Sequence, residues 1–293
     1  MKKSISWLLF IYLTLLLCAA ILGCLSYKII QSLVVIWPCD LLNYLSKKPL
    51  AQYVDRWRLI GFLCIIPLGM RFFDIRWSQW LFPFKWRIFI LNMIKGIVLW
   101  FMLLGCVVAF TKPLTVNVNV HISYVGIFFA SFTIAVLEEW IFRGFFFEVL
   151  NQRCTIFVSQ CLLGLIFALL HFSKCAHTCS SVWLFVQSLQ CAYHSVVDIF
   201  SRIQWTYFLC LFFLNGILVH LRLIYKSLWA CIGFHQGLVF ILMVLRKQYA
   251  FNSSVCCFWG TGRLTDSWFV VGILGLIYIY TGWCVRKLHE KAH

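Results

Sequence analysis

Long apolar runs are the feature that most limits what this chain can fold into. Between polar breaks, the candidate runs are residues 6–26, 58–73, 88–111, 123–149, 155–173, 203–222, 227–245 and 267–285. A helix needs about 20 apolar residues to cross a bilayer, and helices satisfy their own backbone hydrogen bonds in lipid. With 63% hydrophobic and 12% charged residues, the sequence predicts an all-α polytopic membrane protein with about eight transmembrane helices.

The chain is strongly basic, with 25 Lys and Arg against 9 Asp and Glu and a formal net charge of +16. In a soluble protein this charge would suggest a nucleic-acid partner. Here the cations stand singly and in pairs at the ends of apolar runs, as in Lys47–Lys48 and Arg286–Lys287. Topology signals and headgroup contacts are distributed in this way. We therefore expect the lipid bilayer, and no nucleic acid, as a partner.

The cations also predict the orientation of an integral, multi-pass protein. Eight spans place both termini on one side, together with the cations at residues 2–3, 71–87, 153, 222–226 and in the C-terminal tail. The positive-inside rule makes that side cytoplasmic. Residues 27–57 conflict with this assignment, because their four cations, Lys28, Lys47, Lys48 and Arg56, fall on the outer side. An interfacial or re-entrant segment near residues 29–39 would resolve the conflict.

The chain has no internal repeats or linker-like segments, which favours one membrane domain. Its expected parts are N-terminal spans over 1–122, a core over 123–245, and a last span with a basic tail over 246–293. Residues 177–202 mix polar and apolar side chains and predict an amphipathic interfacial helix.

The 15 cysteines do not predict a disulfide framework, because eight of them lie inside apolar runs, where cysteine behaves as a small hydrophobe. The stretch "HFSKCAHTC", with His171, Cys175, His177 and Cys179, has metal-ligand residue types but no common zinc spacing.

The stretch "VLEEWIFRGFFFEVL" places three of the nine acids in one predicted span. Ionisable groups in a span are costly and are candidates for function. Glu139 and Arg143 are spaced i, i+4 and can pair, whereas Glu138 lies about 100° round the helix and stays available as a base. Glu148 lies near the end of the span, where we expect a structural role. The alternative is that the pair only ties helices together, with Glu138 in a wet crevice.

Two histidines, His171 and His235, lie at comparable depth in other apolar runs. A lone histidine in such a run is more often a core residue or an interhelical hydrogen bond. Three spans that each carry a catalytic-type side chain instead predict an intramembrane polar cavity with a hydrolytic site, in which a base activates water and donors stabilise the oxyanion.

Three motifs in this region resemble those of a known family. "EEWIFR" (138–143) matches EExxxR, "FALLH" (167–171) matches FxxxH, and "SLWACIGFH" (227–235) looks like a third motif that leads into a histidine. They occur in the order found in the CPBP family (CAAX protease and bacteriocin-processing, or Abi) of intramembrane endopeptidases, which includes the type II CAAX prenyl proteases. The resemblance covers about 100 residues.

The resemblance implies a role for each matched residue. Glu138 would be the general base that activates water together with His171, Glu139 and Arg143 would hold the site together, and His235 would help to stabilise the oxyanion. The expected function is an integral-membrane endopeptidase. Its expected substrate is a peptide or protein. The resemblance to the family would allow this substrate to be lipidated, with a prenylated CAAX sequence at its C-terminus.

One position departs from the family pattern. The third motif usually continues to Asn or Asp four residues after the histidine, and here that residue is Val239. Loss of one oxyanion donor costs about 100- to 1,000-fold in turnover. Gln236 and Asn215 are candidate replacements, and Asn215 on the preceding span is better placed, although an interhelical hydrogen bond explains it equally well. The alternative function is a catalytically impaired membrane scaffold or immunity-type protein.

No cofactor is favoured. Glu138, His171 and His235 could hold a divalent metal such as zinc, but no HExxH helix fixes two ligands one turn apart. A transporter with a proton relay has no support beyond the buried ionisable groups.

Overall fold

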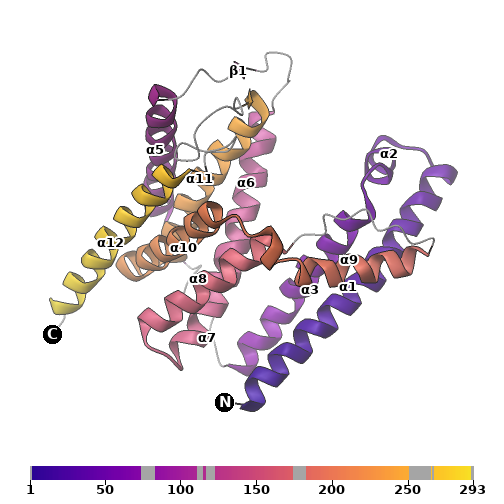
Figure 1. The fold of residues 1–293 in the computed structure, drawn as a ribbon, viewed down its shortest axis with the longest axis horizontal. Coiled ribbons are helices and arrows are strands. Elements are labelled where there is room, and N and C mark those ends of the chain that lie inside the picture. The colour runs from indigo at the N-terminus through magenta and orange to yellow at the C-terminus, as the bar shows by residue number, and fades with distance from the viewer. Residues whose placement is uncertain are drawn as a thin grey trace. The chain divides into compact units, whose positions relative to one another are not determined.

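Helices make up nearly all of the computed structural model, which describes residues 2–73, 83–110, 115–116, 123–173, 183–250, 265 and 267–291 (Figure 1). The helices are α1 (Lys2–Ile36), α2 (Asp40–Ser46), α3 (Leu50–Phe72), α5 (Trp86–Phe110), α6 (Tyr124–Glu139), the π-helix η1 (Trp140–Phe146), α7 (Phe147–Asn151), α8 (Ile156–Phe172), α9 (Leu184–Val197), the 3-10 helix η2 (Phe200–Arg202), α10 (Trp205–Tyr225), α11 (Leu228–Gln248) and α12 (Trp268–Glu290). Two short strands, β1 (Thr115–Val116) and β2 (Tyr249–Ala250), pair antiparallel.

Six helical segments are long and apolar enough to cross a membrane. In the described part of the chain these are Leu13–Ile36, Trp86–Cys106, Tyr124–Asn151, Trp205–Tyr225, Leu228–Gln248 and Trp268–Leu288. The all-α polytopic membrane fold is thereby confirmed. Two predicted spans are not among the six: 58–73 lies within α3, and 155–173 is the 17-residue apolar helix α8.

The first helix is longer than the sequence predicted. It continues through Lys28 to Ile36 and ends just before Trp37 and Pro38. Proline disfavours helical backbone in the residue before it, which accounts for this end. Residues 29–36 therefore continue α1 without a break, and an interfacial position for them stays a prediction.

The chain forms two compact units. The first holds Met1–Gly69 and Leu169–Ile203, and the second holds Met70–Ala168 and Gln204–His293. The single membrane domain and its parts stay a prediction.

In the first unit α9 packs against α1 with its small residues. Its buried side is formed by Ser188, Cys191, Ala192 and Ser195, and its exposed side by Trp183, Phe185, Val186, Tyr193 and Val197. Small residues at a helix contact, with large apolar residues outward, are typical of packing in membranes. The helix is amphipathic as expected, but its small polar side is the packed one. Cys191 is disulfide-bonded, which the sequence analysis did not foresee.

In the second unit α5 and α11 meet backbone to backbone. A Cβ at Gly233 or Gly237 would overlap the main-chain oxygen of Phe89 or Met93, respectively. Likewise, a Cβ at Gly96 would overlap the main-chain oxygen of Phe234. Residue 89 meets residue 233, and residue 93, one turn later, meets residue 237. The two helices therefore run parallel. Because these glycines hold one side of α11 against α5, His235 between them is turned towards another neighbour.

Several helix ends bring basic residues to one end of the second unit. Helices α10 and α12 run parallel, because Gly216 contacts Tyr278 and His220 contacts Thr281. The ends of α10 and α12 lie at the same end of the unit as the starts of α5 and α11 and the connection after α7. These segments carry six cations: Lys85, Arg87, Arg153, Lys226, Arg286 and Lys287. This clustering supports the predicted cytoplasmic side, although the orientation itself stays a prediction.

Arg222 is an exception among the cations assigned to topology. It is buried at the end of α10, where it pairs with Glu148 and lies over the ring of Phe147 at 5.3 Å. Arg222 therefore ties α10 to α7 and is not a headgroup contact. The structural role expected for Glu148 fits this pair.

Candidate active site

A π-helical segment follows directly after the two adjacent glutamates. Helix α6 ends at Glu139, and η1 begins at Trp140 and contains Arg143. π-Helical turns are rare and occur frequently at functional sites. A regular α-helix was expected here, and no residue in "WIFRGFF" signals the wider turn.

The expected ion pair between Glu139 and Arg143 is present. Arg143 Nη1 donates to Glu139 Oε1 at 2.9 Å, and both side chains are fully buried. The guanidinium also lies over the ring of Phe167, 4.8 Å from its centre. A buried pair is stable only where further contacts replace the lost water, and the aromatic face supplies one of them.

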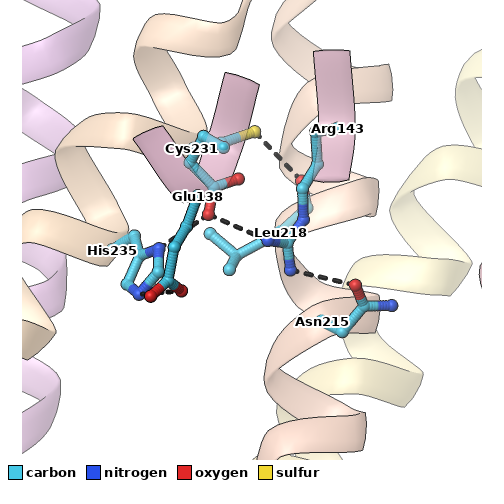
Figure 2. Close-up of polar contacts among 7 residues, drawn as sticks. Glu138, Arg143, Asn215, Leu218, Cys231 and His235 are labelled. Carbon is cyan, nitrogen blue, oxygen red and sulfur yellow. Dashed lines mark hydrogen bonds and ion pairs between the residues drawn. The ribbon is translucent and has the colours of Figure 1, made fainter. Parts of the chain in front are cut away.

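His235 faces both carboxylates, and Figure 2 shows its ring beside Glu138. Its Nδ1 is 2.7 Å from Glu139 Oε1, and its Nε2 is 3.8 Å from Glu138 Oε2. An ionised carboxylate only accepts hydrogen bonds, so we assign the proton to Nδ1. Glu139 thus orients the ring, and the second nitrogen faces Glu138. A histidine ring held in one orientation by a carboxylate is an arrangement found in many hydrolase sites.

Glu138 differs from Glu139 in its exposure. The side chain of Glu138 is 28% exposed, whereas that of Glu139 is fully buried. Glu138 Oε2 makes no hydrogen bond to the described residues. Glu138 is therefore the carboxylate that can take a proton from water, while Glu139 is occupied by Arg143 and His235.

Asn215 completes the buried network from α10. Its Oδ1 accepts from Arg143 Nη2 at 3.0 Å, and its Nδ2 donates to the main-chain oxygen of Gln160 at 3.3 Å. Figure 2 shows the side chain turned towards Arg143. Five helical segments, α6, η1, α8, α10 and α11, thus meet in one set of hydrogen bonds with Glu139 at its centre.

The region that carries this network also matches a known family. Residues 119–241 match the family model described as Type II CAAX prenyl endopeptidase Rce1-like. The predicted resemblance is confirmed over this stretch, which contains all three motifs. No curated protein matches the chain.

Within the Rce1-like region, Asn215 Nδ2 donates to the main-chain oxygen of Gln160, which is the interhelical hydrogen bond of the alternative interpretation. The role of Asn215 as the donor that Val239 lacks stays a prediction. Gln236 is fully buried, and neither its amide oxygen nor its nitrogen has a partner among the described residues. It lies about 100° round α11 from His235, as expected from their adjacency.

His171 lies in the last turn of α8. Residues Leu169–Phe172 of that helix belong to the first unit, whereas the residues of the hydrogen-bond network belong to the second. The pairing of His171 with Glu138 therefore stays a prediction.

A metal site in the Rce1-like region also stays untested. The described residues contain no group of three His, Cys, Asp or Glu side chains that could hold an ion. Cys175, His177 and Cys179 of the "HFSKCAHTC" cluster lie outside the described residues.

Phe167 is the contact that sequence reasoning missed. It is the first residue of "FALLH", it is fully buried, and it packs edge-on against Phe142 at 4.9 Å as well as under Arg143. Its position at the start of the motif was the sequence signal that could have predicted this contact. An aromatic ring can stabilise a buried cation such as the Arg143 guanidinium through a cation–π interaction.

Proposed function

We propose that this chain is an integral-membrane endopeptidase that hydrolyses a peptide bond with a water molecule activated by Glu138. The observation that carries the proposal is the contrast between the two glutamates. Glu139 is buried and bound to Arg143 and His235, whereas Glu138 is partly exposed and faces His235 Nε2. The match to type II CAAX prenyl endopeptidases supports the same reading.

In the proposed reaction Glu138 takes a proton from water, and the resulting hydroxide adds to the carbonyl carbon of the substrate. The developing oxyanion accepts a hydrogen bond from His235 Nε2. Because Glu139 accepts from Nδ1–H, Nε2 donates this bond when the ring carries a second proton. The C–N bond then breaks, and the proton on Glu138 passes to the leaving amine. The family resemblance supports a role for His171 in the same activation of water.

The depth of His235 bears on how a substrate would arrive. His235 is the eighth residue of α11, whose start lies at the basic end of the second unit. At 1.5 Å per residue it lies roughly 10 Å below that end. A peptide segment would enter from the basic end, and a lipid attached to it could stay among the apolar helices. We propose a peptide or protein substrate, with a prenylated CAAX end as the form that the family suggests.

No metal is required by this proposal. If a divalent ion such as zinc bound, Glu138, His171 and His235 would be its ligands, and it would supply polarisation of the bound water.

The second candidate function is a catalytically impaired scaffold or immunity-type protein. Val239 favours it, because valine has no hydrogen bond to give the oxyanion. Among the described residues, Asn215 bonds to Arg143 and Gln160, and the Gln236 amide has no hydrogen-bond partner.

Proteolysis by the purified protein in liposomes tests the proposal. Prenylated and unprenylated CAAX peptides would be offered with and without chelator to wild type, Glu138→Gln and His171→Ala. Glu290→Gln is the matched control, because Glu290 is an exposed glutamate at the end of α12. We expect cleavage by wild type and by the control and none by the two site variants. Cleavage that survives both site variants would overturn the assignment, and no cleavage by folded wild type would favour the scaffold.

A further inference from the structure

Arg58 of α3 is a largely buried cation in the first unit with several partners. Its Nη1 donates to Ser173 Oγ at 2.9 Å and to Ser195 Oγ at 3.2 Å. Its Nη2 donates to the main-chain oxygen of Ser173 at 2.5 Å and pairs with Asp55 at 3.0 Å. Both serines are buried. The guanidinium therefore joins α3, the end of α8 and α9 with charge-assisted hydrogen bonds, the stronger kind.

The backbone beneath Arg58 is tightly packed. Val54, one turn before Arg58, packs with Ala19 of α1 and with Cys191, which lies one turn before Ser195. A Cβ on Gly23 of α1 would lie 3.0 Å from Val54 Cα, so α1 and α3 approach closely at this point. Arg58 thus projects from a part of α3 that is fixed on two sides.

The group that Arg58 holds is the end of α8. Ser173 follows Phe172 directly, and its N–H closes a tight turn onto Leu170 O at 3.2 Å. The last carbonyl groups of a helix have no partners within it, and the helix dipole favours a cation there. The Arg58 guanidinium meets both needs, because it binds the Ser173 oxygen and carries the charge.

We propose that Arg58 is a positioning residue for His171, which lies two residues before Ser173. The inference rests on the proposed function, in which His171 acts with Glu138. Misplacement of a catalytic group by about 1 Å can cost about 100-fold in rate. Within the first unit, Arg58 holds the end of α8 from a packed layer of α1, α3 and α9.

The test measures kcat and KM of the full chain in liposomes for wild type, Arg58→Gln, Arg58→Lys and Arg56→Gln. Arg56 is the matched control, because it is an exposed arginine two residues away on the same helix. We expect Arg58→Gln to lower kcat by about 10- to 100-fold with little change in KM. Arg58→Lys should recover part of the loss, since lysine keeps the charge but not the fork of donors. A wild-type kcat in Arg58→Gln overturns the proposal.

A second variant covers the case in which Arg58→Gln does not fold. Ser173→Ala removes one acceptor and leaves the carbonyl in place, so we expect a folded protein with a kcat reduced by several-fold, about the effect of one lost hydrogen bond. An unchanged kcat in folded Ser173→Ala would refute the positioning role.

Hydrogen exchange separates this proposal from the proposed function. If wild type shows no cleavage that depends on Glu138, the proposed function fails. Hydrogen exchange still shows whether Arg58 holds the end of α8. Amides of Leu169–Ser173 should exchange faster in Arg58→Gln, or in Ser173→Ala, than in wild type and Arg56→Gln, because local opening costs less without the cap. Equal exchange rates would show that Arg58 does not hold the end of α8.

Discussion

At the scale of single residues, the site separates two adjacent glutamates by what each one touches. Glu139 accepts from Arg143 and from His235 through the same oxygen, Oε1. Glu138 has no hydrogen bond to the described residues at its buried oxygen. Glu139 is therefore a structural residue of the site, and Glu138 is available as a base.

This separation predicts opposite effects for two identical substitutions. Glu139→Gln removes the charge that compensates buried Arg143 and should lower the free energy of unfolding by about 3–5 kcal/mol. Glu138→Gln should abolish cleavage while changing stability by less than about 1 kcal/mol, because Glu138 carries no tight pair. Thermal unfolding in detergent, followed alongside peptide cleavage, checks both. Equal destabilisation by the two variants would contradict the assignment.

Asn215 gives a second test at this scale. Asn215→Leu leaves Arg143 Nη2 without its acceptor, which should cost about 1–3 kcal/mol and lower kcat. Asn92→Leu is the matched control, since Asn92 is an equally buried asparagine whose amide donates only to Ile88 O in its own helix. We expect Asn92→Leu to keep wild-type turnover. Similar kcat values in the two variants would argue against a role for Asn215 in the network.

At the scale of elements, sequence reasoning succeeded where one helix determines the outcome. The i, i+4 spacing of Glu139 and Arg143 predicted their pair, because both lie on one face. It did not predict the Arg143–Asn215 bond or the contact of Glu139 with His235, since these depend on how η1, α10 and α11 pack. The length of α1 and the burial of Arg222 were missed for a related reason. Local hydropathy does not record which neighbour covers a charged side chain.

The contact between α5 and α11 makes a prediction for this scale. Gly96→Ala would place a methyl group against Phe234 O and should cost about 1–3 kcal/mol through overpacking. It should also lower cleavage, because it moves the helix that carries His235. Gly105→Ala on the same helix meets no atom within 4 Å and should be neutral or stabilising by up to about 1 kcal/mol. Unfolding midpoints and kcat of the two variants check this, and a harmless Gly96→Ala would contradict the close contact.

At the scale of the whole molecule, the chain is a polytopic membrane protein with an asymmetric distribution of cations at its helix ends. Six exposed or partly exposed cations gather at one end of the second unit, and the described residues at the opposite end include Arg246 and Lys247. The sequence predicted this basic side from the positions of the cations alone. It could not predict the two compact units, because their contacts join residues far apart in the chain.

The charge asymmetry predicts the side of the C-terminus. Because the end of α12 lies at the basic end, a tag placed after His293 should be protected from protease in intact cells and cleaved after permeabilisation. Immunoblotting of the tag measures this directly. Cleavage of the tag in intact cells would reverse the orientation and place the entrance to the site on the outer side.

The wide turn at Trp140–Phe146 has a consequence for the register of the chain around the site. A π-helical stretch takes up more residues per turn than the α-helices on either side, as a single-residue insertion would. The faces of α6 and α7 are therefore out of phase, and the angle between Glu139 and Glu148 is not the one that a 3.6-residue period gives. Deleting one residue within the stretch would return it to an α-helix and rotate everything before it relative to everything after. Either Glu138 and Glu139 would lose their contacts with His235, or Glu148 would lose its ion pair with Arg222. The number of residues in this segment is therefore needed to keep both sets of contacts.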